Sequence, residues 1–264
     1  MSEERKKYLQ KIRLEKILIL GSQILLLVAF LGVWEFAANK GIIDSFITSS
    51  PSRIFSTFTN FSSNDLLMHT KVTCYETIVG FTLGTTLGLI IAIILWWSKF
   101  ISKVVDPYLV VLNSLPKVAL GPIIIIWVGA GTKAIIVMAI AISLIVTILE
   151  ILNGFLNTDK EIIKMAKSFN ASKFQVLTKI VIPANISTFI NSLKISIGLS
   201  LVGVISGEFL ISKAGLGYLI TYGGQVFKLD LVMSSVIILG VVAGLMYLVV
   251  TALEKIILKK NKLR

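Results

Sequence analysis

The sequence predicts an all-α, polytopic membrane protein with about six transmembrane helices. Two observations on composition lead to this fold class: 55% of the 264 residues are hydrophobic and only 15% are charged, whereas a soluble domain carries about 25% charged residues. The third observation is that Ile17–Trp34, Thr77–Ser98 and Leu231–Leu253 contain no charged residue. Each of these runs is long enough to cross a hydrocarbon core about 30 Å thick.

We expect a single transmembrane domain over residues 17–258, between a charged arm at 1–16 and a tail at 259–264. Its spans are expected at about 17–37, 72–98, 104–129, 133–155, 186–211 and 231–253. The second span carries Gly80, Gly84 and Gly88 at intervals of four, a spacing that lets another helix approach closely. Prolines in the third span predict a bent or broken helix, which is a feature of transport pathways. A kink that serves only packing is the alternative.

Lysine and arginine are concentrated on one predicted side of the membrane. With six spans, 18 of the 26 Lys and Arg residues fall on the side that carries the N-terminal arm, the segment 157–184 and the tail, and six fall on the other side. The positive-inside rule therefore places both termini and this segment in the cytoplasm. Because the charge follows the topology, the net charge of +12 does not predict a nucleic acid partner.

The sequence contains no pattern that indicates an enzyme. It has no G-x-x-x-x-G-K-[ST] loop for nucleotide phosphates. His69 and Cys74 are the only histidine and cysteine, which leaves no Ser-His-Asp triad and no metal site built from several of these residues. We therefore predict no catalytic residue, no metal and no cofactor bound by this chain. Five acidic residues lie in or near the spans without an evident paired spacing: Glu35, Glu76, Asp106, Glu150 and Glu208.

The segment 157–184 is predicted to form two short amphipathic helices joined by a turn. Asn170 suits a left-handed turn after the first helix. The second helix starts near Phe174 and is expected to end at Pro183. No other segment on this predicted side is available to cover an apolar face, so the pair implies a partner surface. Four apolar residues share one face of the first helix: Ile162, Met165, Ala166 and Phe169.

The stretch "KMAKSFNASKFQVLTKIVIPA" resembles the EAA loop of binding-protein-dependent ABC importer permeases, whose pattern is E-A-A, three residues, Gly, about nine residues and I-x-L-P. Ala166 matches the second Ala and Pro183 the final Pro, whereas Lys164 stands for the Glu and Asn170 for the Gly. The stretches "TSSPSRIF", "SLPKVALGPIIIIWVGAG" and "GEFLISKAGLGYLI" are similar to other regions of the nitrate/sulfonate/taurine branch of these permeases. The resemblance thus covers almost the whole chain.

This resemblance implies a type I ABC importer permease fold with a cytoplasmic EAA-type coupling helix. It implies two permease copies, as a homodimer, in the lipid of a prokaryotic plasma (inner) membrane. It also implies two ABC ATPase subunits, which bind ATP and magnesium, and an extracytoplasmic solute-binding protein. Burial against the protein's own spans is the competing interpretation of the aromatic residues in the coupling segment. Seven residues are our candidates for ATPase docking: Lys164, Met165, Ala166, Phe169, Asn170, Phe174 and Pro183.

Four residues are our candidates for the translocation pathway: Glu208, Pro116, Lys117 and Pro122. Glu208 either lines the pathway or makes a structural hydrogen bond to a neighbouring helix. The resemblance implies a small, anionic solute of the sulfonate, taurine or nitrate type, and the alternative is a vitamin or vitamin precursor such as a pyrimidine or riboflavin. A more distant alternative is an ion-coupled secondary transporter, which predicts paired buried carboxylates and no exposed docking helix. A third alternative is a membrane scaffold without transport activity, which would not need the Gly, Pro and Glu features inside the spans.

Overall fold

The computed structural model describes residues 3–59 and 65–261, and every regular element in these ranges is a helix. Residues 1–2 of the predicted arm and 262–264 of the predicted tail lie outside the described residues. Five elements contain stretches long and apolar enough to cross a membrane: α1 (Glu3–Asn39), α4 (Leu66–Trp97), α7 (Thr132–Leu156), α11 (Ile186–Ile211) and α13 (Leu229–Asn261). A bent pair, α5 (Lys99–Ser114) and α6 (Gly121–Val128), supplies a sixth crossing when it is taken as one span. The all-α, polytopic prediction is therefore confirmed.

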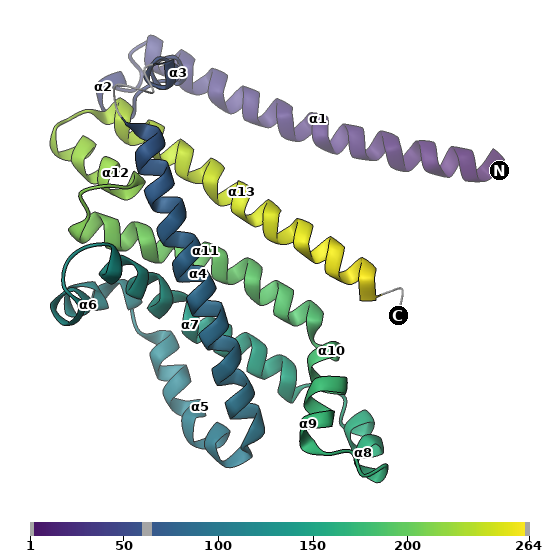
Figure 1. The fold of residues 1–264 in the computed structure, drawn as a ribbon. Helices are drawn as coiled ribbons and strands as arrows, with labels where there is room; N and C mark the ends of the chain where they lie inside the picture. Colours follow the sequence, from purple (N-terminus) through teal and green to yellow (C-terminus); the bar gives the residue numbers. More distant parts are fainter. Residues whose placement is uncertain (1–2, 60–64, 262–264) are drawn as a thin grey trace.

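Short helices lie at the two ends of the bundle (Figure 1). One end carries α8 (Lys160–Ser168), α9 (Lys173–Val176) and α10 (Ile182–Ala184). The other end carries α2 (Ser45–Thr48), α3 (Pro51–Thr59) and α12 (Leu216–Gln225). We refer to these as the α8 end and the α12 end of the bundle.

Helix α7 lies at the centre of the bundle and packs against both α4 and α11. Half of the most apolar window of α7 and of α11 is buried within the chain. By contrast, α1 extends away from the other long helices (Figure 1), and none of its most apolar window is buried. The central three helices therefore form the core, and the apolar surface of α1 is exposed.

The contact between α4 and α7 depends on the predicted stripe of small residues. A Cβ atom added at Gly80 would lie 2.6 Å from the Cβ of Ala139, and one added at Gly88 would lie 2.6 Å from Cγ2 of Thr147. Both distances are shorter than any ordinary carbon–carbon contact, which is about 3.5–4.0 Å. The glycines therefore permit the close approach of the two helices.

The third predicted span, 104–129, is not one continuous helix. Helix α5 ends before Leu115, and a 3₁₀ turn, η1 (Lys117–Leu120), leads into α6. The segment Lys117–Val128, which comprises η1 and α6, is bent by 91° from α5. The cause is Pro116, which has no N–H group and which disfavours the α conformation of the residue before it. Leu115 is accordingly extended, with φ −67° and ψ 142°. Pro122 lies in the first turn of α6, where a missing N–H costs nothing.

Candidate functional site

Helices α8 and α9 form the helix pair predicted for the coupling segment (Figure 1). The carboxylate of Asp159 accepts the N–H of Glu161 at 2.8 Å and caps the start of α8. Asn170 follows α8 in the left-handed conformation, with φ 55°, as its residue type predicted. Ser172 and Gln175 then form a capping box at the start of α9, with distances of 2.8 and 3.2 Å. Local hydrogen bonds therefore fix both helix starts and the turn between them.

One face of the helix pair is apolar and exposed. Phe169 is 81% exposed and Phe174 is 64% exposed, although both are large aromatic side chains. The interpretation that these aromatic residues are buried against the protein's own spans is therefore wrong. A contiguous exposed apolar surface marks an interaction site. We call the exposed apolar side chains of the pair the α8–α9 patch: Ile162, Met165, Phe169 and Phe174.

The opposite face of the pair is anchored in the protein's own core. Ala166, Val176, Leu177 and Val181 are buried in one hydrophobic cluster together with side chains of α4 and α7. Ala166 therefore differs from our prediction, since its side chain is covered by this chain and does not belong to the exposed surface. Its small size lets α8 lie close to the core, so Ala166 positions the patch instead of extending it.

Polar contacts that the sequence did not predict join the pair to the long helices. Lys173 Nζ donates to the carbonyl oxygen of Trp97 at the end of α4 and lies 5.3 Å from the centroid of its ring. Asn185, which follows α10, donates from Nδ2 to Oγ1 of Thr158 at 2.7 Å and to the carbonyl oxygen of Val181 at 2.8 Å. The patch is thus held on both α4 and the end of α7.

Two other docking candidates have roles that differ from the prediction. Lys164 Nζ pairs with Oε1 of Glu161 at 2.9 Å on the exposed surface of α8, next to the patch. Pro183 was predicted to end the second helix, but the chain stays helical from Lys173 to Ala184 through a wide π-helical turn, η2 (Leu177–Val181). Pro183 occupies the first turn of α10, where a proline is tolerated because its N–H is not needed.

Three of the four pathway candidates lie at the break between α5 and α6. Pro116 and Lys117 form the bend, and Pro122 starts α6. The half-buried Lys117 donates from Nζ to Oδ1 of Asn113 at 3.0 Å, one turn earlier. Gly121 faces side chains of α7 and α11 so closely that an added Cβ atom would overlap them. The structure therefore seats the break against the central helices.

The fourth candidate, Glu208, is 1% exposed and holds the start of α12. Thr73 Oγ1 donates to Oε1 of Glu208 at 2.7 Å, and the N–H of Gly217 donates to Oε2 at 2.5 Å. The Thr73 hydroxyl in turn accepts the N–H of Leu216 at 2.8 Å. Glu208 therefore makes the structural hydrogen bond to a neighbouring helix that was one of its two predicted interpretations.

His69 and two glycines complete this cap. His69 Nδ1 accepts the N–H of Gly215 at 2.9 Å, so side chains of α4 and α11 satisfy three consecutive amides at the start of α12. Gly215 has φ +108°, a conformation that side-chain-bearing residues rarely adopt. A Cβ atom added at Gly217 would lie 2.8 Å from Oε2 of Glu208. The sequence G-L-G is thus required for the carboxylate to reach the helix terminus.

A second buried glutamate, Glu76, lies near Glu208, and their spacing in the sequence did not predict this. Glu76 is also 1% exposed, and it lies one helical turn after Thr73, whose hydroxyl donates to Glu208. Among the described residues, no group donates a hydrogen bond to either oxygen of Glu76. Paired buried carboxyl groups were the prediction for an ion-coupled transporter, and an exposed helix pair was the prediction for an importer. The structure has both features.

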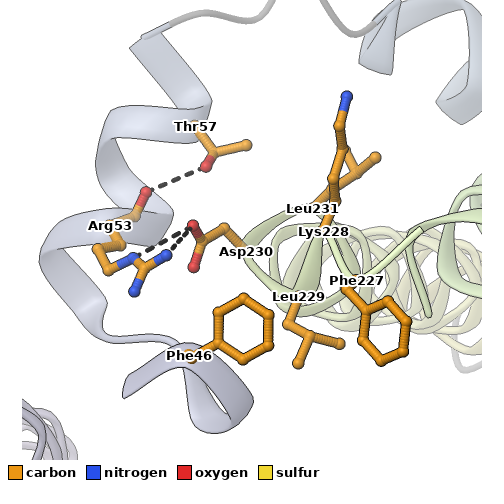
Figure 2. Close-up of a pocket in the computed structure, with 8 residues that line it drawn as sticks. All are labelled: Phe46, Arg53, Thr57, Phe227, Lys228, Leu229, Asp230 and Leu231. Carbon is orange, nitrogen blue, oxygen red and sulfur yellow. Dashed lines mark hydrogen bonds and ion pairs between the residues drawn. The ribbon is translucent and has the colours of Figure 1, made fainter. Parts of the chain in front are cut away.

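A pocket of about 330 Å³ opens at the α12 end, between α2, α3 and the start of α13 (Figure 2). Arg53 and Asp230 close one side of it with an ion pair of 2.7 Å, and Ser49 donates to the same carboxylate at 2.7 Å. Phe227 is exposed and has φ 55°, which is strained for an aromatic residue. The pocket is lined by Phe46, Arg53, Thr57, Phe227, Lys228, Leu229, Asp230 and Leu231.

The chain is similar in sequence to known transport proteins. Residues 84–262 match the family described as binding-protein-dependent transport system inner membrane component. A relative from Haemophilus influenzae, whose name refers to an ABC transporter permease, is 32% identical over 90% of this chain and 94% of its own length. The formylaminopyrimidine transport permease protein of Halalkalibacterium halodurans is 24% identical over 87% of this chain and 92% of its own length. Names of other relatives refer to aliphatic sulfonates, riboflavin, taurine and nitrate.

The fold is similar to that of a solved ABC transporter chain. A chain of the MetNI methionine ABC transporter in an inward-facing conformation superposes with a TM-score of 0.64 over 71% of this chain and 94% of that chain. The two sequences are 17% identical, so the similarity concerns the fold alone. It confirms the ABC importer permease fold that the resemblance implied.

Proposed function

The chain belongs to the family of binding-protein-dependent transport system inner membrane components, and we propose that it is the permease subunit of an ATP-driven ABC importer. As a permease it contributes the membrane-spanning part of the transporter for a small solute. In this proposal, two copies of a separate ATPase subunit bind and hydrolyse ATP. A solute-binding protein delivers the solute, and two copies of this chain enclose the pathway.

The α8–α9 patch is the observation that carries this proposal. Its aromatic side chains are exposed at the end of the bundle, yet the helices that bear them are anchored to α4 and α7. An apolar surface on a rigid support suits a partner that must move the spans, because a displacement of the patch is passed to the long helices. The patch therefore fits an ATPase subunit whose closure on ATP drives transport.

The α8 end is cytoplasmic in this proposal. The start of α1, the end of α13 and helices α8 and α9 all lie toward this end (Figure 1), and these segments carry most of the basic residues of the chain. The positive-inside rule places such segments in the cytoplasm. The α12 end then faces outward, where a solute-binding protein approaches.

We assign the outer pocket to the docking of the solute-binding protein. The pocket combines a fixed ion pair, Arg53–Asp230, with exposed Phe227 and exposed Lys228 (Figure 2). Aromatic and basic side chains around a concave surface favour a protein partner. A strained, exposed aromatic residue such as Phe227 is typical of a functional position.

The second copy of the chain has surface to pack against. The most apolar window of α1 has no buried residue, and only 11% of that of α13 is buried. A second permease and membrane lipid share these surfaces in our proposal. The break at Pro116, Lys117 and Pro122 lines the pathway between the two copies, since a non-helical backbone within a membrane is stable only inside a bundle or against a water-filled cavity.

The substrate in this proposal is a small, anionic solute of the sulfonate, taurine or nitrate type. The names of several relatives support this class. Relatives named for formylaminopyrimidine and riboflavin favour a vitamin or vitamin precursor as the second candidate. Ligand screening of the associated binding protein, by the shift of its melting temperature, distinguishes the two candidates.

Co-purification tests the proposed assembly. The tagged chain is extracted from its native membrane in mild detergent, and the proteins that accompany it are identified by mass spectrometry. We expect an ABC ATPase subunit with the wild type and its loss with Phe174→Asp, because a buried, unpaired carboxylate opposes docking. If neither the wild type nor Phe174→Asp co-purifies with an ATPase subunit, the proposal is contradicted.

Phe227→Asp is the matched control. It places the same change on an equally exposed phenylalanine at the other end of the bundle. We expect this variant to keep the ATPase and to lose chemical cross-linking to the solute-binding protein, while Phe174→Asp shows the reverse. Loss of both partners with either variant would indicate misfolding instead of two separate surfaces.

A further inference from the structure

Two glutamate side chains from different helices are buried near the α12 end. Glu76 belongs to α4 and Glu208 to α11, and each is 1% exposed. Glu76 lies one helical turn after Thr73, whose hydroxyl donates to Glu208 at 2.7 Å, so the two carboxyl groups are neighbours. Within residues 3–59 and 65–261 neither forms an ion pair with a lysine or arginine. Two ionised carboxylates are not stable in this position, because burial removes their hydration and like charges repel. The pair therefore requires a positive counterpart.

Glu208 has the surroundings of the ionised member. It accepts the Gly217 N–H at 2.5 Å and the Thr73 hydroxyl at 2.7 Å, one on each oxygen. The amide lies in the first turn of α12, where the helix dipole favours negative charge. Hydrogen bonds from such groups to a carboxylate are stronger than those to a neutral acid. The charge of the pair therefore belongs on Glu208.

Glu76 has the surroundings of a neutral acid. No donor among the described residues reaches either of its oxygens with hydrogen-bond geometry, although the hydroxyl of Thr132 at the start of α7 is near. A buried carboxylate without donors carries the full cost of lost hydration, whereas a protonated carboxyl group is neutral and needs one acceptor. The adjacent Glu208 carboxylate is such an acceptor.

The charged residues on the surrounding elements do not replace the missing positive charge. Lys71 on α4, Lys133 on α7 and Lys213 after α11 are exposed, and none of them pairs with either glutamate within the described part of the chain. His69 lies one helical turn before Thr73 on α4, but its Nδ1 accepts the Gly215 N–H and so carries no proton. Helix α12 contributes no charged side chain.

We propose that Glu76 and Glu208 form a proton-binding site, in which one proton is shared as a hydrogen bond from the Glu76 carboxyl group to the Glu208 carboxylate. Water supplies the proton. The pair keeps a net charge of −1, and this charge lies next to the backbone amides at the start of α12. The bound proton acts as a structural ligand that joins α4 to α11 and α12. This site does not depend on the ATPase or on the transported solute.

Infrared spectroscopy of the purified full-length chain in D₂O at neutral pH tests the proposal directly. A protonated carboxyl group has a carbonyl stretching band that ionised glutamates lack, and we expect this band in the wild type. Glu76→Gln keeps the size and a donor to Glu208, so it should fold normally and lose the band. Glu208→Gln should keep the band. If the wild type lacks this carbonyl band, or if only Glu208→Gln removes it, the proton does not lie on Glu76 and the proposal is overturned.

A pH series of melting temperatures gives a second readout. Removal of the proton leaves two facing carboxylates, so the wild type should lose stability as the pH rises from neutral to alkaline values, while Glu76→Gln should lose less. Both proteins keep His69, Cys74 and Tyr218, the other titratable groups near the pair, so the difference between them isolates Glu76. Equal pH dependence of the two proteins contradicts the proposal.

A metal cation is the alternative ligand for a pair of carboxyl groups. Melting temperatures with added sodium, potassium or calcium chloride at fixed pH and ionic strength separate the two ligands. We expect no salt-specific stabilisation of the wild type over Glu76→Gln. A rise of the wild-type melting temperature with one cation, absent in the variant, would show a metal site and overturn the proton site.

Discussion

At the scale of single residues, the absence of a side chain decides how the start of α12 is held. Glu208 reaches the amide of Gly217 because the positions on both sides of Leu216 are glycines. Gly215 needs its positive φ for the turn, and Gly217 needs the space that a Cβ atom would fill. The carboxylate and the two glycines therefore act as one unit.

We predict that Gly217→Ala destabilises the protein by about 1–3 kcal/mol, the usual cost of overpacking a tight contact. The added Cβ would lie 2.8 Å from the Glu208 carboxylate. Gly224→Ala is the matched control in the same helix, because no atom lies within 4 Å of its added Cβ. Thermal unfolding in detergent measures the melting temperatures of the two variants, and Gly224→Ala should unfold at or above the wild-type temperature. Similar melting temperatures for the two variants would contradict this account of the cap.

At the scale of elements, the turn between α8 and α9 sets the direction of the patch. Asn170 holds φ 55° at this turn, between Phe169, which directly follows α8, and Phe174 in α9. A left-handed conformation costs most residues about 1–2 kcal/mol, and asparagine and glycine accept it more readily. The shape of the patch therefore depends on a residue that does not itself belong to it.

We predict that Asn170→Val weakens the recovery of the ATPase in co-purification several-fold, whereas Asn170→Gly preserves it. Valine is β-branched and disfavours the left-handed turn, so α9 must shift relative to α8. The amount of ATPase per permease, measured by quantitative mass spectrometry, checks this. If valine and glycine give equal recovery, the turn does not set the geometry of docking.

Elements with strong local signals could be predicted from the sequence, and contacts between distant segments could not. Capping residues and the special conformation of asparagine are local, so helix α8 and its turn were predicted well. Pro116 was recognised as a breaking residue, but whether a proline kinks a helix or divides it depends on the neighbours that take up the free backbone groups.

The site around Glu208 likewise depends on contacts between distant segments, which the sequence does not predict. Thr73 and Glu76 lie in one predicted span and Glu208 lies in another, and only the packing of α4 against α11 brings them together. Nor could periodicity show that Ala166 faces inward while Phe169 faces outward, because both belong to one apolar stripe. Tertiary packing divided that stripe between the core and the exposed surface.

At the scale of the whole molecule, the two ends of the bundle present different surfaces. The α8 end carries the apolar α8–α9 patch, and the α12 end carries the pocket around Arg53 and Asp230. The three central helices connect them, and the break at Pro116 lies against this core. The arrangement suits a protein that receives a solute at one end and a driving force at the other.

The proposed orientation rests on the distribution of charge, and cysteine labelling tests it. We predict that, with Cys74 replaced by Ser, a membrane-impermeant maleimide labels Lys228→Cys in spheroplasts and does not label Lys167→Cys until the membrane is disrupted. Both lysines are exposed in the structure, so a difference between them reports sidedness. The opposite pattern would reverse the proposed topology.

The central claim is that the α8–α9 patch seats an ATPase subunit, and photo-cross-linking in living cells tests it most directly. A photoreactive phenylalanine analogue is placed at position 174 in one strain and at position 227 in another. Our account predicts an irradiation-dependent adduct with an ABC ATPase subunit from position 174 only. An ATPase adduct from position 227 alone, or none from position 174 in cells that transport the solute, would contradict it.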